Sequence, residues 1–230
     1  MKSIGGDGSL WRNGFVAKNF SSETKMTLAS TSNSGSAAAE PLACAVFIVA
    51  AFILSGAAHV LWLRSAASMR FSFPIDCGLS LRGKRIFGDH KMSRGFVVIV
   101  PATGAAFLML YVFVRTAAPA FAAQLWSAAP WQYAAFGLWA GFGFMAGELP
   151  NSFVKRRLEI PPGRLPAHPS VRWVCLVADR VDSILGMLGA LSVVVSVPTL
   201  TWIYVILVGA GIHWTFSVVL FALGVKERMA

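Results

Sequence analysis

The chain has 230 residues, of which 56% are hydrophobic and only 13% are charged, and its formal net charge is +10. Such a composition is too apolar for an ordinary soluble domain. The charged residues are also clustered, so that long tracts without Asp, Glu, Lys or Arg alternate with short charged segments. This pattern predicts an all-α integral membrane protein.

The first 40 residues are rich in Ser, Gly, Ala and Thr and carry scattered charge. They lack the continuous apolar stretch of a signal peptide. We interpret residues 1–40 as a disordered N-terminal tail, or as the product of an over-long start choice. Residues 41–230 then form one polytopic membrane domain.

Four uncharged tracts are long enough to cross a bilayer, which takes about 20 helical residues. They cover residues 42–63, 95–114, 116–147 and 183–225. The last tract is long enough for two crossings, and Pro198 is the natural turn between them. We therefore predict five transmembrane helices, at about residues 42–63, 95–115, 130–149, 176–197 and 199–223.

Lysine and arginine concentrate in two loops, with seven in residues 64–94 and six in residues 150–182. By the positive-inside rule, both loops and the C-terminus are cytoplasmic, which places the N-terminus outside. The net positive charge mostly reflects this bias, so it does not indicate nucleic-acid binding. We expect the cell membrane of a bacterium or archaeon, with catalytic loops on the cytoplasmic face.

Three polar segments lie at this face, covering residues 87–95, 147–157 and 179–183. In the third, Asp179 and Asp182 are three apart, so a helix places both on one face at the mouth of an uncharged span. Two carboxylates this close repel one another unless a cation lies between them, and oxygen ligands near a polyphosphate favour Mg²⁺. Glu148 could supply a third carboxylate. The alternative is a local ion pair between Arg180 and one aspartate.

Basic side chains in the first two segments could neutralise phosphate charge, with arginine acting in a bidentate manner. They are Lys91, Arg94, Lys155, Arg156 and Arg157. The loop at Gly163, surrounded by prolines, could hold backbone donors near a phosphate. A basic cluster beside a span is usually a topology signal or a contact with anionic lipid, so these residues alone do not define a site.

Two predicted spans carry small residues at helical spacing, a pattern that favours close helix packing in lipid. They are Gly137-xxx-Gly141 and Gly143-xxx-Gly147 in the third span, and Gly186 and Gly189 in the fourth. His59 and His213 also fall within spans. No partner for either is readable from the sequence, so we favour structural hydrogen bonding over catalysis.

Taken together, the three polar segments resemble the CDP-archaeol synthase family of membrane cytidylyltransferases, which is related to the phosphatidate cytidylyltransferases. The family pattern is a G-x-H-K-x-x-R-G loop, then G-D-x-x-K-S-F-x-K-R-R, a P-G loop, and D-Q-x-D leading into a span. Asp179-Arg180-Val181-Asp182-Ser183 also resembles the D-R-x-D-S element of the phosphatidate enzymes. The similarity covers about residues 42–225, with matches at Gly88, His90, Lys91, Arg94, Gly95, Gly147, Ser152, Phe153, Lys155, Arg156, Arg157, Pro162, Gly163, Asp179 and Asp182.

The resemblance implies a CTP-dependent enzyme that transfers CMP from CTP to a membrane lipid phosphate, giving a CDP-lipid and pyrophosphate for phospholipid synthesis. The acceptor would be phosphatidic acid or an ether-lipid analogue. The partners would be CTP, the lipid phosphate and the bilayer, and a homodimer is left open. The implied roles are catalysis by Lys155, Arg156, Arg157, Asp179 and Asp182, substrate binding by His90, Lys91, Arg94, Ser152 and Gly163, and Mg²⁺ binding by Asp179, Asp182 and Glu148.

The chain departs from the family pattern at three positions of the polar segments. Glu148 replaces an Asp, Asn151 replaces a Lys, and Arg180 replaces a Gln. Loss of that lysine puts one phosphate contact in question. Two other classes therefore stay open, a degenerate non-catalytic homologue that binds nucleotide or lipid, and a small membrane transporter. Tolerance of changes at Asp179 and Asp182 would identify the former, and polar residues lining mid-membrane helices the latter.

Overall fold

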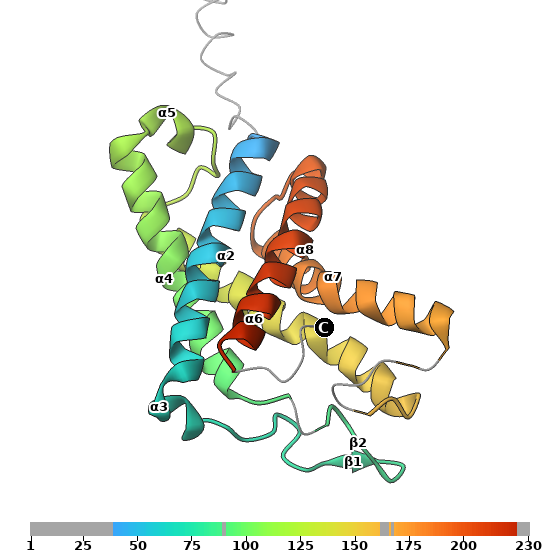
Figure 1. Ribbon diagram of the computed structural model, residues 1–230. Helices are drawn as coiled ribbons and strands as arrows, with labels where there is room; N and C mark the ends of the chain where they lie inside the picture. Colours follow the sequence, from blue (N-terminus) through green and yellow to red (C-terminus); the bar gives the residue numbers. More distant parts are fainter. Residues whose placement is uncertain (1–38, 89–90, 162–165, 167, 225–230) are drawn as a thin grey trace, which may run out of the picture. The chain divides into compact units, whose positions relative to one another are not determined.

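The computed structural model describes residues 39–88, 91–161, 166 and 168–224, except for the side chain of His213. Within these residues nearly all regular structure is helical, as predicted (Figure 1). The predicted N-terminal tail lies outside the described residues, apart from its last two. In chain order the elements are α2 (Pro41–Arg64), α3 (Ala66–Met69), β1 (Ser80–Leu81), β2 (Lys84–Arg85), α4 (Arg94–Ala117), α5 (Pro119–Ala122), α6 (Pro130–Arg157), α7 (Pro169–Val194) and α8 (Thr199–Ala222).

Three helices are long and apolar enough to cross a membrane, namely α2 over Pro41–Leu63, α4 over Arg94–Ala117 and α8 over Thr199–Ala222. They match the first, second and fifth predicted spans and make this an integral membrane protein. The third and fourth predicted spans fall on α6 and α7. α6 is rich in glycine and α7 contains Asp179, Arg180 and Asp182, so both are less apolar. A count of five crossings stays a prediction.

The ends of the long helices follow local sequence signals, with one exception. The Glu40 carboxylate accepts a hydrogen bond from the backbone N–H of Ala43, at 2.5 Å, and so caps α2. Pro198 immediately precedes α8 and forms the predicted turn. α6, however, does not end near residue 149 but continues through Pro150 to Arg157. Pro150 removes one backbone donor but does not end the helix. The residues Asn151 and Lys155 therefore lie on α6 itself and not in a loop.

α6 lies between α4 and α7 and packs most extensively against these two helices (Figure 1). Its first glycine pair faces α4, where a Cβ atom on Gly137 would come within 2.8 Å of the Cα atom of Gly104. Its second pair faces α7, where a Cβ atom on Gly147 would lie 2.9 Å from the Cα atom of Gly186. The predicted role in close helix packing is confirmed for both pairs of α6 and for Gly186 of α7, whereas it is wrong for Gly189, where an added Cβ atom would meet nothing within 4 Å.

An aromatic cluster joins the helices at the end where α6 begins. Tyr133 stacks on Tyr111 of α4, with ring centroids 3.7 Å apart, and its hydroxyl donates to the carbonyl of Trp126 at 2.7 Å. The rings of Phe47 from α2 and Tyr133 form a T-shaped pair with their centroids 5.5 Å apart. The indole of Trp126 donates to the carbonyl of Ser196, between α7 and α8, at 2.9 Å. These contacts fix the helices to one another at the end remote from the polar segments.

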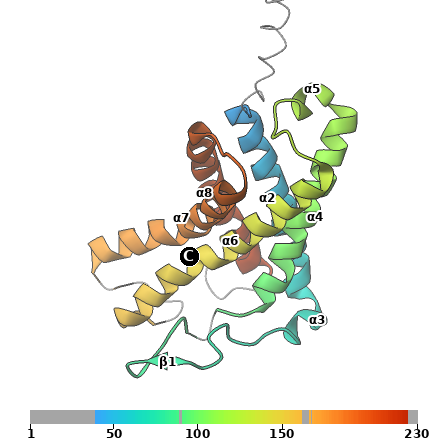
Figure 2. The ribbon, with the colours of Figure 1, turned by 180° about the vertical axis from the view of Figure 1, so that it is seen from behind.

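The loops between α2 and α4 lie at the end of the bundle where α6 terminates. Figures 1 and 2 show α3, the β1–β2 hairpin, the start of α4 and the last turns of α6 together at this end. The segment before the hairpin is held to the segment before α4 by backbone hydrogen bonds, from Ile75 to Lys91 and from Ser93 to Phe73, each 2.9 Å long. The segment before α4 is thereby fixed at the end of the membrane domain where α6, which carries the second polar segment, also ends.

Candidate functional site

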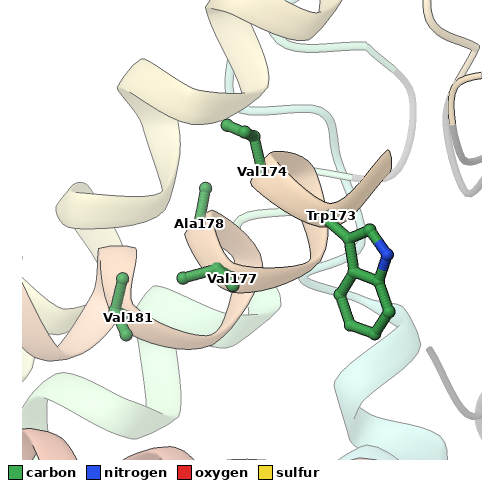
Figure 3. A pocket seen from close by; sticks show the side chains of 5 residues that line it. All are labelled: Trp173, Val174, Val177, Ala178 and Val181. Atoms are coloured by element: carbon green, nitrogen blue, oxygen red, sulfur yellow. The ribbon is translucent and has the colours of Figure 1, made fainter. Parts of the chain in front are cut away.

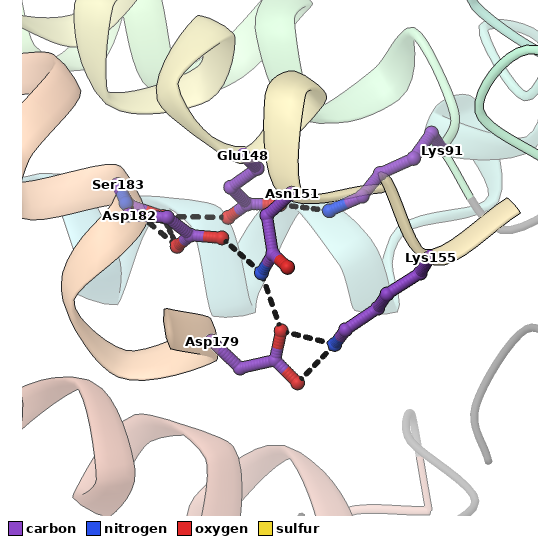
Figure 4. A network of polar contacts seen from close by, with 7 residues as sticks. All are labelled: Lys91, Glu148, Asn151, Lys155, Asp179, Asp182 and Ser183. Carbon is purple, nitrogen blue, oxygen red and sulfur yellow. Dashed lines mark hydrogen bonds and ion pairs between the residues drawn. The ribbon is translucent and has the colours of Figure 1, made fainter. Parts of the chain in front are cut away.

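A network of charged and polar side chains connects the loop before α4 with α6 and α7 (Figure 4). The members on α6 are three and four residues apart, so they share one face of the helix, and the same holds for those on α7. The network consists of Lys91 from the loop, Glu148, Asn151 and Lys155 from α6, and Asp179, Asp182 and Ser183 from α7. The three polar segments predicted to meet therefore do so.

Asn151 links the two aspartates of α7. Its amide nitrogen donates to Oδ1 of Asp179 at 2.7 Å and to Oδ2 of Asp182 at 2.8 Å. One neutral donor thus serves two carboxylates that would otherwise repel one another. In the sequence this residue stood out only as the replacement of a lysine, and its bridging role was not predicted.

Ser183 links Asp182 to Glu148. The Ser183 hydroxyl donates to Oε1 of Glu148 at 2.9 Å and lies 3.3 Å from Oδ1 of Asp182. The serine is buried, so its hydroxyl requires a protein partner. Two small uncharged side chains therefore connect the three carboxylates: Asn151 connects Asp179 with Asp182, and Ser183 connects Asp182 with Glu148.

Two lysines neutralise part of this negative charge. The Lys155 ammonium contacts both oxygens of Asp179, with 2.6 Å to Oδ2, and Lys91 forms an ion pair with Glu148. Asp179 therefore pairs with Lys155 of α6, and the alternative, an ion pair between Arg180 and one of the two aspartates, is not found among the described contacts. With all groups ionised, two ammonium groups face three carboxylates, and the network carries one net negative charge.

The donor chemistry of the network fits Mg²⁺, although its present arrangement is not a closed metal cage. Carboxylate and amide oxygens are the ligands this ion prefers. Among the residues that the structure describes, no three Asp, Glu, His or Cys side chains are grouped closely enough to hold a metal ion. Lys155 and Asn151 fill the space between the carboxylates instead. The assignment of Mg²⁺ to Asp179, Asp182 and Glu148 stays a prediction.

Three of the other predicted site residues lie on α6 and α4. Ser152 is buried on α6, and Arg156 is half-buried in its last turn. Arg94 begins α4, and its guanidinium lies 3.8 Å from the sulfur of Met69. His90 and Gly163 lie outside the described residues, as does Pro162. Their roles in substrate binding or catalysis stay predictions.

Arg157 contacts the hairpin rather than the network. Its guanidinium donates to the carbonyls of Leu81 at 2.5 Å, Arg85 at 2.8 Å and Lys84 at 3.0 Å, and it lies 5.2 Å from the ring centroid of Phe153. These bonds attach the β1–β2 hairpin to the end of α6. Residues two positions apart on a helix do not share a face, so Lys155 and Arg157 cannot both face α7. A catalytic role for Arg157 stays a prediction.

Asp76 is a structural centre of the loop that the sequence analysis did not single out. Its buried carboxylate accepts from Arg85 at 2.5 Å and from the backbone N–H groups of Phe87, Gly88 and Gly78 at 3.1–3.3 Å. The Arg85 guanidinium and then these N–H groups hold the pKa of Asp76 well below its ordinary value. The bond to Gly78 is an Asx turn, and the sequence Asp-x-Gly is the signal that could have revealed it.

Replacing Asp76 by asparagine is expected to lower the free energy of unfolding by about 3 kcal/mol, because it leaves Arg85 without its anionic partner. The folded pKa lies below the unfolded one, so this stabilisation is fully present above pH about 4 and is lost as the pH falls. Chemical denaturation in detergent at several pH values measures it. If the difference in the free energy of unfolding between wild type and Asp76→Asn stayed the same well below pH 4, the lowered pKa of Asp76 would be contradicted.

A shallow surface pocket on the first half of α7 is entirely apolar. Figure 3 shows its lining, made up of Trp173, Val174, Val177, Ala178 and Val181. The pocket offers no polar group and can only contact apolar groups, whereas the polar network lies on another face of the same helix.

Comparison with known proteins assigns the family. A family model described as CarS-like, CDP-archaeol synthase, matches residues 64–229, which include all three polar segments. The chain belongs to the CDP-archaeol synthase family. The resemblance carried by the motifs is thereby confirmed.

Individual CDP-archaeol synthases show the same relationship. The chain is 34% identical to the enzyme named CDP-archaeol synthase from Halobacterium salinarum over 160 residues, which are 67% of this chain and 82% of that protein. It is 29% identical to the CDP-archaeol synthase of Pyrococcus furiosus over 158 residues, 67% of this chain and 81% of that protein. No solved structure matches the chain.

Membership of the CDP-archaeol synthase family gives the departures at residues 148 and 151 a physical meaning. Glu148 keeps the carboxylate of the family pattern on a longer arm, and it reaches Lys91 and Ser183. Asn151 replaces a cation by a neutral amide at the centre of the network. Both substitutions preserve a connected site, and the second makes it more negative.

Proposed function

We propose that this enzyme, a CTP-dependent lipid cytidylyltransferase, transfers CMP from CTP to a membrane lipid phosphate and releases pyrophosphate. The observation that carries the proposal is the carboxylate–lysine network across α6 and α7, in which acidic and basic side chains meet at one end of a membrane domain. Phosphatidic acid or an ether-lipid phosphate is the proposed acceptor, and phospholipid synthesis is the proposed use of the CDP-lipid.

The reaction needs positioning and charge stabilisation more than it needs a base. An oxygen of the lipid phosphate forms a bond to the α-phosphorus of CTP while the bond from that phosphorus to the oxygen bridging to the β-phosphate breaks. The lipid phosphate is already an anionic nucleophile, so no side chain has to remove a proton. The protein's task is to hold two anions together against their repulsion.

Basic side chains near the network are suited to that task. We assign Lys155 and Arg156, with Arg157, to the phosphate groups of CTP, and Lys91 and Arg94, with His90, to the nucleotide or the lipid head group. Ser152 and Gly163 complete the proposed substrate site. Lys155 and Lys91 already lie within the network through their ion pairs with Asp179 and Glu148.

Asp179, Asp182 and Glu148 would hold Mg²⁺, which when bound would offset triphosphate charge. Asn151 and Ser183 keep these three carboxylates beside one another by hydrogen bonds. The apolar pocket of α7 has the chemistry that a lipid hydrocarbon chain would contact. We place this site at the cytoplasmic face of the cell membrane, following the distribution of Lys and Arg.

The proposal predicts that purified protein in detergent converts CTP and a lipid phosphate to a CDP-lipid, and that EDTA abolishes the conversion. Labelled CTP is incubated with phosphatidic acid or with an ether-lipid phosphate, and the lipid fraction is separated and counted. Mg²⁺-dependent labelling of either lipid supports the reaction class, and the preferred acceptor identifies the substrate. Protein that is folded but labels neither lipid would favour the degenerate-homologue interpretation.

A further inference from the structure

The Lys155 ammonium occupies the oxygens of Asp179 that a metal ion would need. It contacts both Oδ1 and Oδ2, while Oδ1 also accepts from Asn151 at 2.7 Å. A carboxylate engaged in this way has little capacity left for a further cation. A divalent ion at Asp179 must therefore compete with Lys155.

Leaving either Lys155 or Asp179 without a counter-charge would be energetically unfavourable. The side chain of Lys155 is 13% exposed and that of Asp179 is 32% exposed, so both are only partly hydrated. Separating a partly buried ion pair is costly when one member is left without a counter-charge. If an ion takes over Asp179, Lys155 needs another anion within reach.

The phosphates of a nucleotide provide that anion. Lys155 lies at the α6 end of the network, on a flexible four-carbon stem whose ammonium can turn from one partner to another. A metal–nucleotide complex brings both replacement charges at once, a cation for Asp179 and an anion for Lys155. Metal alone, or nucleotide alone, brings only one of them.

We infer that Lys155 couples metal binding to nucleotide binding by exchanging partners, from the Asp179 carboxylate to a nucleotide phosphate. This inference rests on the proposed function for the identity of the nucleotide. The Lys155–Asp179 ion pair keeps the metal affinity low until CTP arrives. Because coupling is reciprocal, the metal favours nucleotide binding to the same degree.

The ion pair between Lys91 and Glu148 repeats this arrangement on the other side of Ser183. It supplies a second ammonium that can turn toward phosphate when a cation reaches the carboxylates. Lys155 is the better test, because its ammonium contacts both oxygens of its partner.

The test measures Mn²⁺ binding to the purified protein in detergent without nucleotide. The electron paramagnetic resonance signal of free Mn²⁺ reports how much of the ion stays unbound. Replacing Lys155 by glutamine removes the competing charge, so Mn²⁺ is expected to bind at least about ten-fold more tightly than to the wild type. The matched control is Lys84→Gln, which removes the same charge from an exposed ion pair with Glu159 outside the network. That variant is expected to bind Mn²⁺ like the wild type.

A Lys155→Gln protein that binds Mn²⁺ no better than the wild type would overturn the inference. If glutamine prevents folding, Lys155→Met, which keeps an unbranched stem, is used in its place. A separate measurement of CMP transfer by the wild type tests the proposed reaction independently of the partner exchange. An active wild type with an unchanged Lys155→Gln affinity refutes only the exchange, whereas tighter Mn²⁺ binding without any CMP transfer supports the competition and refutes the proposed reaction.

Discussion

Replacing Asp182 by asparagine is expected to lower the rate of CMP transfer by at least about 100-fold while leaving the protein folded. The substitution removes one of three carboxylate charges from the network but keeps the size and shape of the side chain. Its one carbonyl oxygen can accept either the hydrogen bond that Asn151 gives to Oδ2 at 2.8 Å or the one that the Ser183 N–H gives to Oδ1 at 2.7 Å, but the amide nitrogen cannot accept the other. Loss of activity reflects the lost charge where the unfolding temperature equals that of the wild type. The rate of label transfer from CTP to lipid phosphate measures the effect, and thermal unfolding in detergent checks the fold.

The matched control is Glu159→Gln, which removes one carboxylate charge from an exposed side chain paired only with Lys84 in the described contacts. Its activity should equal that of the wild type. An Asp182→Asn enzyme that retained comparable activity would remove Asp182 from the metal site and would favour a site without the α7 carboxylates.

Replacing Gly186 by alanine is expected to reduce both stability and activity. A Cβ atom at this position would lie 2.5 Å from the Cα atom of Gly147, closer than real Cβ contacts occur. The helices α6 and α7 must therefore move apart, at a cost of about 2 kcal/mol in the free energy of unfolding. Since Asn151 and Lys155 reach Asp179 across this contact, a displacement of about 1 Å should lower the rate of CMP transfer by about 100-fold.

Gly189→Ala provides the comparison on the same helix. A Cβ atom on Gly189 would have no neighbour within 4 Å, and the residue is not in the left-handed region. Its alanine variant should match the wild type in unfolding temperature and activity. Equal behaviour of the two alanine variants would show that the close contact between α6 and α7 does not position the network.

Much of the fold could be predicted from where charge is absent. Uncharged tracts predicted α2, α4 and α8 to within about two residues, because a helix in lipid needs a continuous apolar sequence of set length. The third span was predicted to end at about residue 149, whereas α6 continues to Arg157, because charged residues mark the end of an apolar tract and not the end of a helix. The short hairpin at 80–85 was also missed, since it is held partly by Arg157, which is remote in the sequence from its turn.

The charged side chains of the network were among the residues singled out in the sequence, but their pairings were not predicted. Spacing predicted Asp179 and Asp182 on one helix face, and the positive-inside rule predicted Lys155 at the same face of the membrane. That Lys155 pairs with Asp179, and that Asn151 bridges both aspartates, depends on the register between α6 and α7. This register is set by the contact of Gly147 with Gly186, which lie far apart in the sequence. A helical periodicity specifies faces, whereas it does not specify which residues of two facing helices lie side by side.

The most direct test of the proposed reaction is the fate of two different labels. Purified enzyme is given a lipid phosphate and CTP labelled either at the α-phosphorus or at the γ-phosphorus. Transfer of CMP predicts that the α-label appears in the lipid fraction and the γ-label in pyrophosphate, and that Asp182→Asn abolishes both. A γ-label in the lipid, or an α-label that stays in water-soluble nucleotide while the wild type is folded, would contradict the account.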